Sequence, residues 1–367
     1  MKKIGLIAPN LAGSGAEKVV LHLAEMFEKE GNEVHIFLLE NIVSYDTKGA
    51  TIHCLSQRRT LFKFFKGFGD FLLARRLRKK INLLSADGVP FDLIASNLPA
   101  ADRVTEKASL PHCQYLIHTS YSLEIEEFRK RGKRYRAHKK EKLYHRLYTD
   151  KDLIAVAEGI KHDLVKMGIP FRSCKVIYNP FDFNIIRDRA REESELNIEG
   201  EYLLSASAFR PVKRHDILLK AYRKLDNPPP LKLLCKGDPK LENLIVELGL
   251  QERVEILGFV KNPYSVIQNA RLLILSSERE GLPTVLIEAL ILGTAVVSTD
   301  CISGPSEILT GEMQRYLANV NDASSLAEKI GLALEKYPEI EYTALEKFSS
   351  ETVYRKYMKL HQLSYSS

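Results

Sequence analysis

The sequence lacks any apolar stretch of the roughly 18 or more residues that a membrane-spanning helix needs. The apolar part of its opening, MKKIGLIAPN, is too short for a signal peptide and is typical of a first β-strand, so we expect a cytoplasmic protein. Cysteine is also scarce. The five cysteines are widely scattered and form no CxxC pair, which argues against a disulfide framework or a zinc site.

Positive charge is abundant in only two places. Segments 58–80 and 129–142 each hold nine Lys or Arg and one acid, so the rest of the chain has a net negative charge. Both segments lie in the first half, where they favour a phosphate-bearing partner or an anionic membrane surface. The few apolar residues of 129–142 indicate a mobile loop. In segment 61–80, Leu61, Phe65, Phe68 and Leu72 have helical spacing. This fits equally a helix that lies on anionic lipid or touches phosphorylated saccharide, and an ordinary amphipathic helix.

Short apolar strands alternate with longer amphipathic helices, which predicts doubly wound α/β layers. The pattern runs once through each half of the 367 residues, so we expect two Rossmann-like domains, 1–183 and 198–345. The strands are predicted at 3–8, 33–39, 92–97, 113–118 and 152–157, and then at 201–207, 231–237, 254–259, 271–277 and 294–299. A last helix, about 346–367, could pack back on the first domain.

Three loops follow predicted strands, and in such sheets ligands gather at the carboxyl ends of strands. In the first, PNLAGSGAEKVV, Gly13 and Gly15 permit a tight turn before a helix. The loop lacks the third glycine of the dinucleotide fingerprint and has no GK[ST], so it supports neither NAD nor a P-loop. The second, SASAFRPVKRHD, brings Arg210, Lys213 and Arg214 toward a crevice, where they could neutralise a diphosphate or form a solvated basic turn.

The third loop is SEREGLPTVLIEALILG, residues 277–293. Pro283 suits the first turn of a helix, whose amino-terminal N–H groups, including those of Thr284 and Val285, would be available to a phosphate. Glu288 lies among apolar residues of this helix, and a buried carboxylate must meet a donor. Sugar or ribose hydroxyls would serve, and so would a structural partner; charge placement alone leaves both open.

The spacing of Glu280 and Glu288 in SSEREGLPTVLIEAL, followed by GTAVVSTD and GPSEIL, resembles the signature of the family 4 retaining glycosyltransferases. The serine before the first glutamate, the Glu-Gly, the proline, Gly293 and the later Gly-Pro-x-Glu all occur in the family's order. Further similarities, in GSGAEKVV, AVAEGIKHDLV, VIYNPFD and KGDPKLENL, extend the resemblance over most of the chain. It implies the GT-B fold, in which two Rossmann-like domains face a central cleft.

The resemblance also implies an activity, the transfer of a sugar from a nucleoside diphosphate sugar with retained anomeric configuration. Glu280 would hold hydroxyls of the donor sugar and Glu288 the ribose. Lys213 matches the family's phosphate-binding lysine, and His118 resembles the histidine that faces the donor sugar. The donor diphosphate would meet the N–H groups of the segment that comprises Gly281, Leu282, Pro283, Thr284 and Val285, while Gly15 belongs to the loop on the acceptor side.

Fixed cations and helix N–H groups would stabilise the charge on the leaving diphosphate, so we expect neither a metal nor a cofactor. Asp150 and Asp152 form a literal DxD, but they precede a strand and so lie at the wrong end of it to face the crevice. The sequence departs from the family at Ser207-Ala208, where many relatives have Gly-Arg. Arg210 or Arg214 could replace that arginine.

The sequence therefore predicts a metal-independent retaining glycosyltransferase that uses a nucleotide sugar, with UDP-sugars favoured, and a saccharide or glycolipid acceptor of lipopolysaccharide or another surface glycan. The basic segments would bring it to the inner face of the membrane. The alternatives are a nucleotide-sugar epimerase or glycogen-synthase-like enzyme of the same fold, and a non-catalytic nucleotide- or carbohydrate-binding protein. No motif for reading nucleic acid is present, so no nucleic-acid partner is expected.

Overall fold

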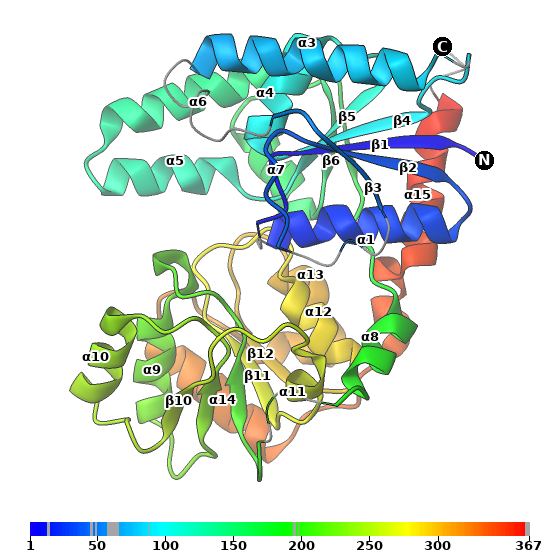
Figure 1. The fold of residues 1–367 in the computed structure, drawn as a ribbon. Coiled ribbons are helices and arrows are strands. Elements are labelled where there is room, and N and C mark those ends of the chain that lie inside the picture. Colours follow the sequence, from blue (N-terminus) through cyan, green and yellow to red (C-terminus); the bar gives the residue numbers. More distant parts are fainter. Residues whose placement is uncertain are drawn as a thin grey trace. The chain divides into compact units, whose positions relative to one another are not determined.

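The computed structural model divides the chain into two compact units (Figure 1). Unit 1 comprises Met1–Phe181 and Phe348–Ser367, and unit 2 comprises Asp182–Lys347. The structure describes residues 1–12, 15–44, 47, 50–56, 66–86, 88–193, 196 and 198–363. Gly13, Leu61 and Phe65, which the sequence singles out, lie outside these residues.

Unit 1 contains a seven-stranded parallel sheet with the order β3-β2-β1-β4-β5-β6-β7. Its strands are β1 (Lys3–Ala8), β2 (Glu33–Leu38), β3 (Thr51–Cys54), β4 (Leu93–Asn97), β5 (Cys113–Ile117), β6 (Asp152–Ala155) and β7 (Ser173–Val176). The central strands β1 and β4 are buried along their whole length, as their mainly apolar residues predict.

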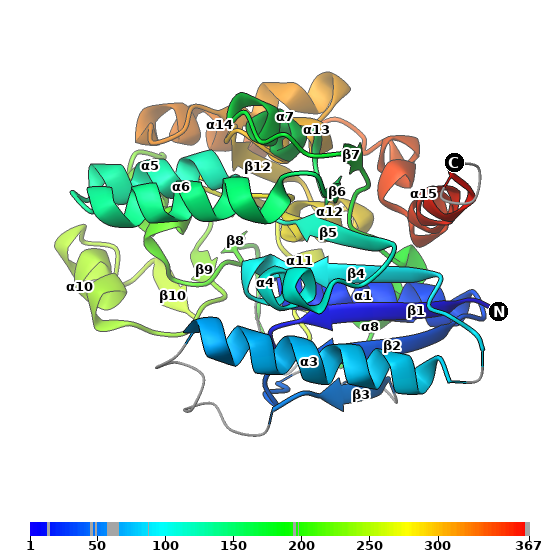
Figure 2. The same cartoon turned by 90° about the horizontal axis from the view of Figure 1, so that it is seen from above.

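Helices cover both faces of this sheet (Figure 2). They are α1 (Gly15–Lys29), α3 (Lys66–Leu84), α4 (Leu98–Ala108), α5 (Tyr121–Lys130), α6 (Arg134–Tyr148), α7 (Glu158–Lys166) and α15 (Ser350–Leu363). One core lies between the sheet and α1 with α15, and a second between the sheet and α3 with α4. Unit 1 is therefore doubly wound.

The last helix packs in unit 1, although it follows unit 2 in the sequence. Phe181 and Ser350 pair through their backbones, with the N–H of Ser350 donating to the carbonyl of Phe181 at 3.0 Å. Phe27 of α1 then meets Tyr357 of α15 edge to face, with ring centroids 5.5 Å apart. The chain therefore returns to unit 1 beside the point where it leaves.

Unit 2 contains a six-stranded parallel sheet with the order β10-β9-β8-β11-β12-β13. The strands are β8 (Leu203–Ser205), β9 (Leu231–Leu233), β10 (Val254–Ile256), β11 (Leu272–Leu275), β12 (Val296–Thr299) and β13 (Leu317–Ala318). The α-helices are α8 (Phe183–Ala190), α9 (His215–Arg223), α10 (Pro239–Glu247), α11 (Tyr264–Gln268), α12 (Thr284–Ile291), α13 (Pro305–Ile308) and α14 (Ala323–Glu335), and the 3₁₀ turns are η1 (Pro211–Lys213), η2 (Gly311–Tyr316) and η3 (Tyr342–Phe348).

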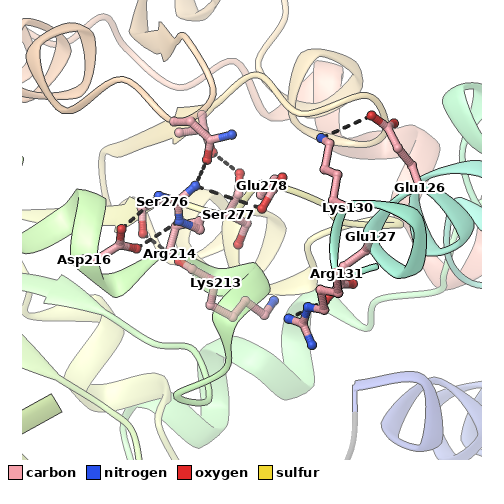
Figure 3. Close-up of polar contacts among 12 residues, drawn as sticks. Glu126, Glu127, Lys130, Arg131, Lys213, Arg214, Asp216, Ser276, Ser277 and Glu278 are labelled. Carbon is pink, nitrogen blue, oxygen red and sulfur yellow. Dashed lines mark hydrogen bonds and ion pairs between the residues drawn. The ribbon is translucent and has the colours of Figure 1, made fainter. Parts of the chain in front are cut away.

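The prediction of a mobile loop at 129–142 is wrong, because this segment is the turn and the beginning of the α5–α6 helical hairpin. Many of its cations also have acidic partners. Lys130 pairs with Glu126 at 3.1 Å and Arg131 with Glu127 at 2.6 Å, one helical turn back on α5 (Figure 3). These glutamates precede the counted segment, so the segment's own composition overstated the excess positive charge of the hairpin.

A buried hydrogen-bond network anchors the hairpin to the sheet. The carboxyl group of Asp102, on α4, accepts from Ser96 Oγ at 2.6 Å and from Tyr148 Oη at 2.8 Å. Tyr148 ends α6, and its hydroxyl also lies 2.7 Å from that of Tyr121, which begins α5. Burial raises the pKa of Asp102 to about 8 despite these donors. The network thus ties the first residue of α5 and the last residue of α6 to α4 and β4.

Candidate functional site

The strand order of unit 2 marks where a ligand would bind. Strand β8 lies in the middle of the sheet; the chain passes from it to β9 and β10 on one side, and later returns to β11 on the other. In doubly wound sheets, ligands bind outside the carboxyl ends of the two strands at which the direction reverses. Here these are β8 and β11, and the loops that follow them are 206–214 and 276–283.

Hydrogen bonds join these two loops. The N–H of Glu278 donates to the carbonyl of Val212 at 2.8 Å. Ser276 Oγ, on a residue that is 3% exposed, donates to the carbonyl of Lys213 at 2.8 Å (Figure 3). The two segments therefore form one surface, although they lie more than 60 residues apart in the sequence.

Lys213 and Glu280, predicted separately for the phosphate and the sugar, form an ion pair. Lys213 Nζ lies 2.6 Å from Glu280 Oε1, and the two side chains are 23% and 11% exposed. Ser277 Oγ donates to the same carboxylate oxygen at 2.5 Å. Both contacts fall on Oε1. The ion pair therefore fixes the position of the lysine side chain beside the Glu280 carboxylate.

The segment from β12 to α13 packs against the turn that carries Glu280 and supports it. Thr299 Oγ1 donates to the carbonyl of Ser277 at 2.6 Å, and Ser303 Oγ donates to the carbonyl of Gly281 at 2.7 Å. Gly304 packs so closely that an added Cβ would lie 2.4 Å from Pro283 Cδ. The later Gly-Pro-x-Glu motif thus supports the turn that carries Glu280. Its place in the sequence did not reveal this role.

Helix α12 begins directly after this turn, with Pro283 at the N-cap position. The proline side chain has no acceptor atom and makes no capping hydrogen bond. The amino-terminal N–H groups of the helix therefore lie at the carboxyl ends of β8 and β11. The positive end of the helix dipole lies there too. Glu288, in the middle of α12, is 3% exposed and has buried apolar neighbours along the helix, as the sequence predicted.

The structure distinguishes the two arginines. Arg214 binds both carboxylate oxygens of Asp216 at 2.9 and 2.8 Å, donates to Asn321, and lies 4.0 Å from Glu278 (Figure 3). Hydrogen bonding from Arg214 lowers the pKa of Asp216. The side chain of Arg210 is exposed and, within the described part of the chain, makes no hydrogen bond or ion pair. Arg214 therefore holds loops together, whereas Arg210 is available for an anion.

Arg210 also borders an open pocket of about 600 Å³ between the loop after β8 and helix α10. Lys240 and Asn243 of α10 line it, and so does His215, whose ring contacts that of Phe209. Burial lowers the pKa of His215 to about 4, so that imidazole is neutral at pH 7. The arginine thus has space in which to reorient.

Two predicted residues belong to unit 1. His118 directly follows β5, and its Nε2 lies 3.0 Å from Asn97 Oδ1 at the end of β4. Burial lowers the pKa of His118 to about 4. Gly15 is the first residue of α1. Asn97 was missed by sequence reasoning, and its signal was a polar residue that ends an apolar strand.

Asp150 and Asp152 lie at the amino end of β6, as predicted, and Arg172 approaches both at 3.6 and 3.2 Å. Within the described residues, no group of three or more His, Cys, Asp or Glu is arranged to hold a metal ion.

Two family models together match most of the chain. Residues 13–184 match the one described as Glycosyltransferase Family 4, and residues 186–349 match Glycosyl transferases group 1. The chain belongs to the family 4 glycosyltransferases. This glycosyltransferase is similar to the N-acetylgalactosamine-N,N'-diacetylbacillosaminyl-diphospho-undecaprenol 4-alpha-N-acetylgalactosaminyltransferase of Campylobacter jejuni, with 28% identity over 91% of both chains. It is 25% identical to the lipopolysaccharide 1,6-galactosyltransferase of Escherichia coli over 58% of this chain and 61% of that one.

Solved structures share the fold of this family 4 glycosyltransferase. Anabaena HepE in complex with UDP and glucose has a TM-score of 0.74 at 18% identity, over 99% of this chain and 100% of that one. Sucrose-phosphate synthase from Thermosynechococcus elongatus has a TM-score of 0.76 at 17% identity, over the full length of both chains. The two parallel-sheet Rossmann-like units are those of GT-B glycosyltransferases.

Proposed function

We propose that this glycosyltransferase moves a sugar from a nucleoside diphosphate sugar to a saccharide acceptor with retention of the anomeric configuration. The observation that carries the proposal is the Lys213–Glu280 pair beside the amino terminus of α12, at the carboxyl ends of β8 and β11. A cation and uncapped N–H groups suit a diphosphate, and a carboxylate suits sugar hydroxyls. A nucleoside diphosphate sugar requires both kinds of group, for its diphosphate and for its sugar, within one surface.

In the proposed reaction, the bond between the anomeric carbon and the diphosphate oxygen breaks, and its electron pair stays on the phosphate. The acceptor hydroxyl oxygen bonds to that carbon, and its proton passes to the departing phosphate oxygen. Lys213, Arg210 and the N–H groups of α12 stabilise the charge that develops on the leaving diphosphate. Glu280 holds sugar hydroxyls, Glu288 the ribose and His118 the sugar. These groups supply the positive charge themselves, so the proposal includes no metal or cofactor.

The substrates of related proteins support the choice of substrates. HepE binds UDP and glucose, which favours a UDP-sugar as donor here. The Campylobacter jejuni and Escherichia coli relatives act on a diphospho-undecaprenol-linked saccharide and on lipopolysaccharide. We therefore propose that the acceptor is a lipid-linked saccharide or lipopolysaccharide and that the chain serves surface-glycan synthesis.

The donor is tested by thermal unfolding with UDP-, GDP-, ADP- and CMP-sugars, each with and without EDTA. We expect one nucleotide sugar, most simply a UDP-sugar, to raise Tm equally in both conditions; a hundredfold excess over Kd stabilises the folded state by about 2.7 kcal/mol. Arg210→Gln should reduce the shift because it removes a free cation. The matched variant Arg214→Gln should mainly lower Tm without ligand, because it opens the loop contacts. Equal shifts in both variants would contradict this assignment.

We also propose that α3 contacts an anionic membrane surface. The outward face of this helix carries Phe68 (64% exposed) and Phe71 (55% exposed), followed by exposed Arg75 and Lys79, while its acid, Asp70, points inward and pairs with Arg103 at 2.9 Å. Exposed aromatic and basic side chains on one helix face suit an anionic lipid surface. Among the described residues, no helix combines the length and apolar character needed to span a membrane.

This membrane proposal predicts co-sedimentation with phosphatidylglycerol-containing vesicles but not with vesicles of phosphatidylcholine alone. Binding should fall when the salt concentration is raised. The double variant Phe68→Ser with Phe71→Ser should bind the vesicles more weakly. The double variant Arg75→Gln with Lys79→Gln should also bind more weakly, most of all at low salt. Binding that ignores salt, lipid charge and all four substitutions would exclude α3 as the contact.

A further inference from the structure

The side chain of Asn97 does not make the hydrogen bond that is usual for an asparagine at its position. It is the N-cap residue of α4, and at this position an asparagine oxygen normally accepts from a free N–H of the helix. Here the side chain makes no such bond. The next residue, Leu98, has a φ of 73°, a left-handed conformation that is costly for a leucine. A lost cap followed by backbone strain indicates that the side chain is held for another purpose.

The hydrogen bonds of Asn97 define how its amide is oriented. Nδ2 donates to the carbonyls of Ile7 and Ala95, at 3.3 Å each, in a fully buried setting. Because carbonyl oxygens only accept, the amide nitrogen must face them, and the reverse orientation would bring oxygen against oxygen. Oδ1 therefore points to His118 Nε2, 3.0 Å away.

This orientation determines the protonation of His118. An amide oxygen can only accept, so Nε2 must carry the hydrogen. The lowered pKa keeps the imidazole neutral at pH 7, and a neutral ring has a single N–H. Nδ1 is therefore left with a lone pair, and within the described residues it makes no hydrogen bond.

We propose that Asn97 is a positioning residue that holds His118 in the Nε2–H tautomer and so presents Nδ1 as an acceptor for a hydroxyl of the donor sugar. The tautomer of the neutral ring follows from the contacts of Asn97; the sugar contact rests on the proposed function. The register of the parallel strands makes the arrangement possible, because Asn97 of β4 lies opposite Leu116, two residues before His118.

The tautomer is measured directly by long-range ¹H–¹⁵N NMR of the full chain labelled at histidine, with the His118 signals assigned by their loss in His118→Gln. We expect Nε2 to be protonated and Nδ1 unprotonated at neutral pH. In Asn97→Asp the new carboxylate should raise the pKa of His118, so that both nitrogens are protonated near neutrality and Nδ1 is freed as pH rises. Asn82→Asp, on the exposed face of α3, is the control and should change neither nitrogen.

Kinetics then separate positioning from a merely structural role. Asn97→Ala should lower kcat roughly tenfold with little change in KM, and Asn97→Ala with His118→Gln should be no worse than His118→Gln alone, because the two act as one unit. Asn97→Asp should regain activity at higher pH. A protonated Nδ1 in the unaltered protein, or additive losses in the double variant, would overturn the proposal. A protein with the expected tautomer but no response to any nucleotide sugar would instead contradict the proposed function.

Discussion

Replacing Lys213 with methionine is expected to lower kcat by roughly 10²- to 10³-fold, the usual loss when one fixed donor to a developing charge is removed. Methionine keeps the length of the side chain but removes the cation that lies 2.6 Å from Glu280 Oε1. The charge on the departing diphosphate then loses its nearest fixed partner. Steady-state kinetics at saturating donor check the result.

The matched control for this substitution is Lys220→Met, which removes an exposed cation from α9. Its kcat should stay within twofold or so of the unaltered enzyme, as expected for a surface change. If Lys213→Met raised KM and left kcat intact, the lysine would bind the donor equally in the ground and transition states. That outcome would remove Lys213 from the stabilisation of the leaving group.

Gly304→Ala is expected to destabilise unit 2 by about 3 kcal/mol or more, because two costs combine. Gly304 has a φ of 95°, and its added Cβ would lie 2.4 Å from Pro283 Cδ and 2.8 Å from the carbonyl oxygen of Gly281. The turn that carries Glu280 would have to move. Urea unfolding should show the loss, and donor binding should weaken further than the loss of folded protein explains.

Gly311→Ala separates the two costs. This glycine also has a positive φ, 59°, but an added Cβ would meet no atom within 4 Å. Its substitution should cost only about 1 kcal/mol and leave donor binding unchanged. Equal destabilisation by the two alanines would mean that the backbone conformation, and not contact with the Glu280 turn, explains the requirement for glycine at position 304.

Sequence periodicity was sufficient to predict the two doubly wound sheets, because their central strands are continuous apolar runs. It also predicted the positions of Lys213 and Glu280, since both follow strands whose carboxyl ends lie at the crevice. The short strands β3 and β13 were missed. Two of the four residues of β3 are exposed, and β13 has only two residues, so neither produces a strong apolar signal.

Long-range partners could not be predicted from composition. Arg214 and Asn321 are 107 residues apart, and only the fold reveals that this arginine is occupied while Arg210 is not. Lys130 and Arg131 are a similar case, because their acidic partners precede the segment whose charge was counted. In the sequence, Asn97 is recognisable only as a polar residue that ends a strand. Its hydrogen bond to His118 depends on the register of β4 against β5.

The most direct test of the central claim is the anomeric configuration of the product. The enzyme is incubated in EDTA with the nucleotide sugar selected by thermal unfolding and a lipid-linked saccharide acceptor, and the new glycosidic linkage is examined by proton NMR while released nucleoside diphosphate is quantified. We expect equal amounts of nucleoside diphosphate and glycoside, a linkage with the anomeric configuration of the donor, and a rate unchanged by EDTA. An inverted linkage, or transfer that requires added metal, would contradict the proposed mechanism.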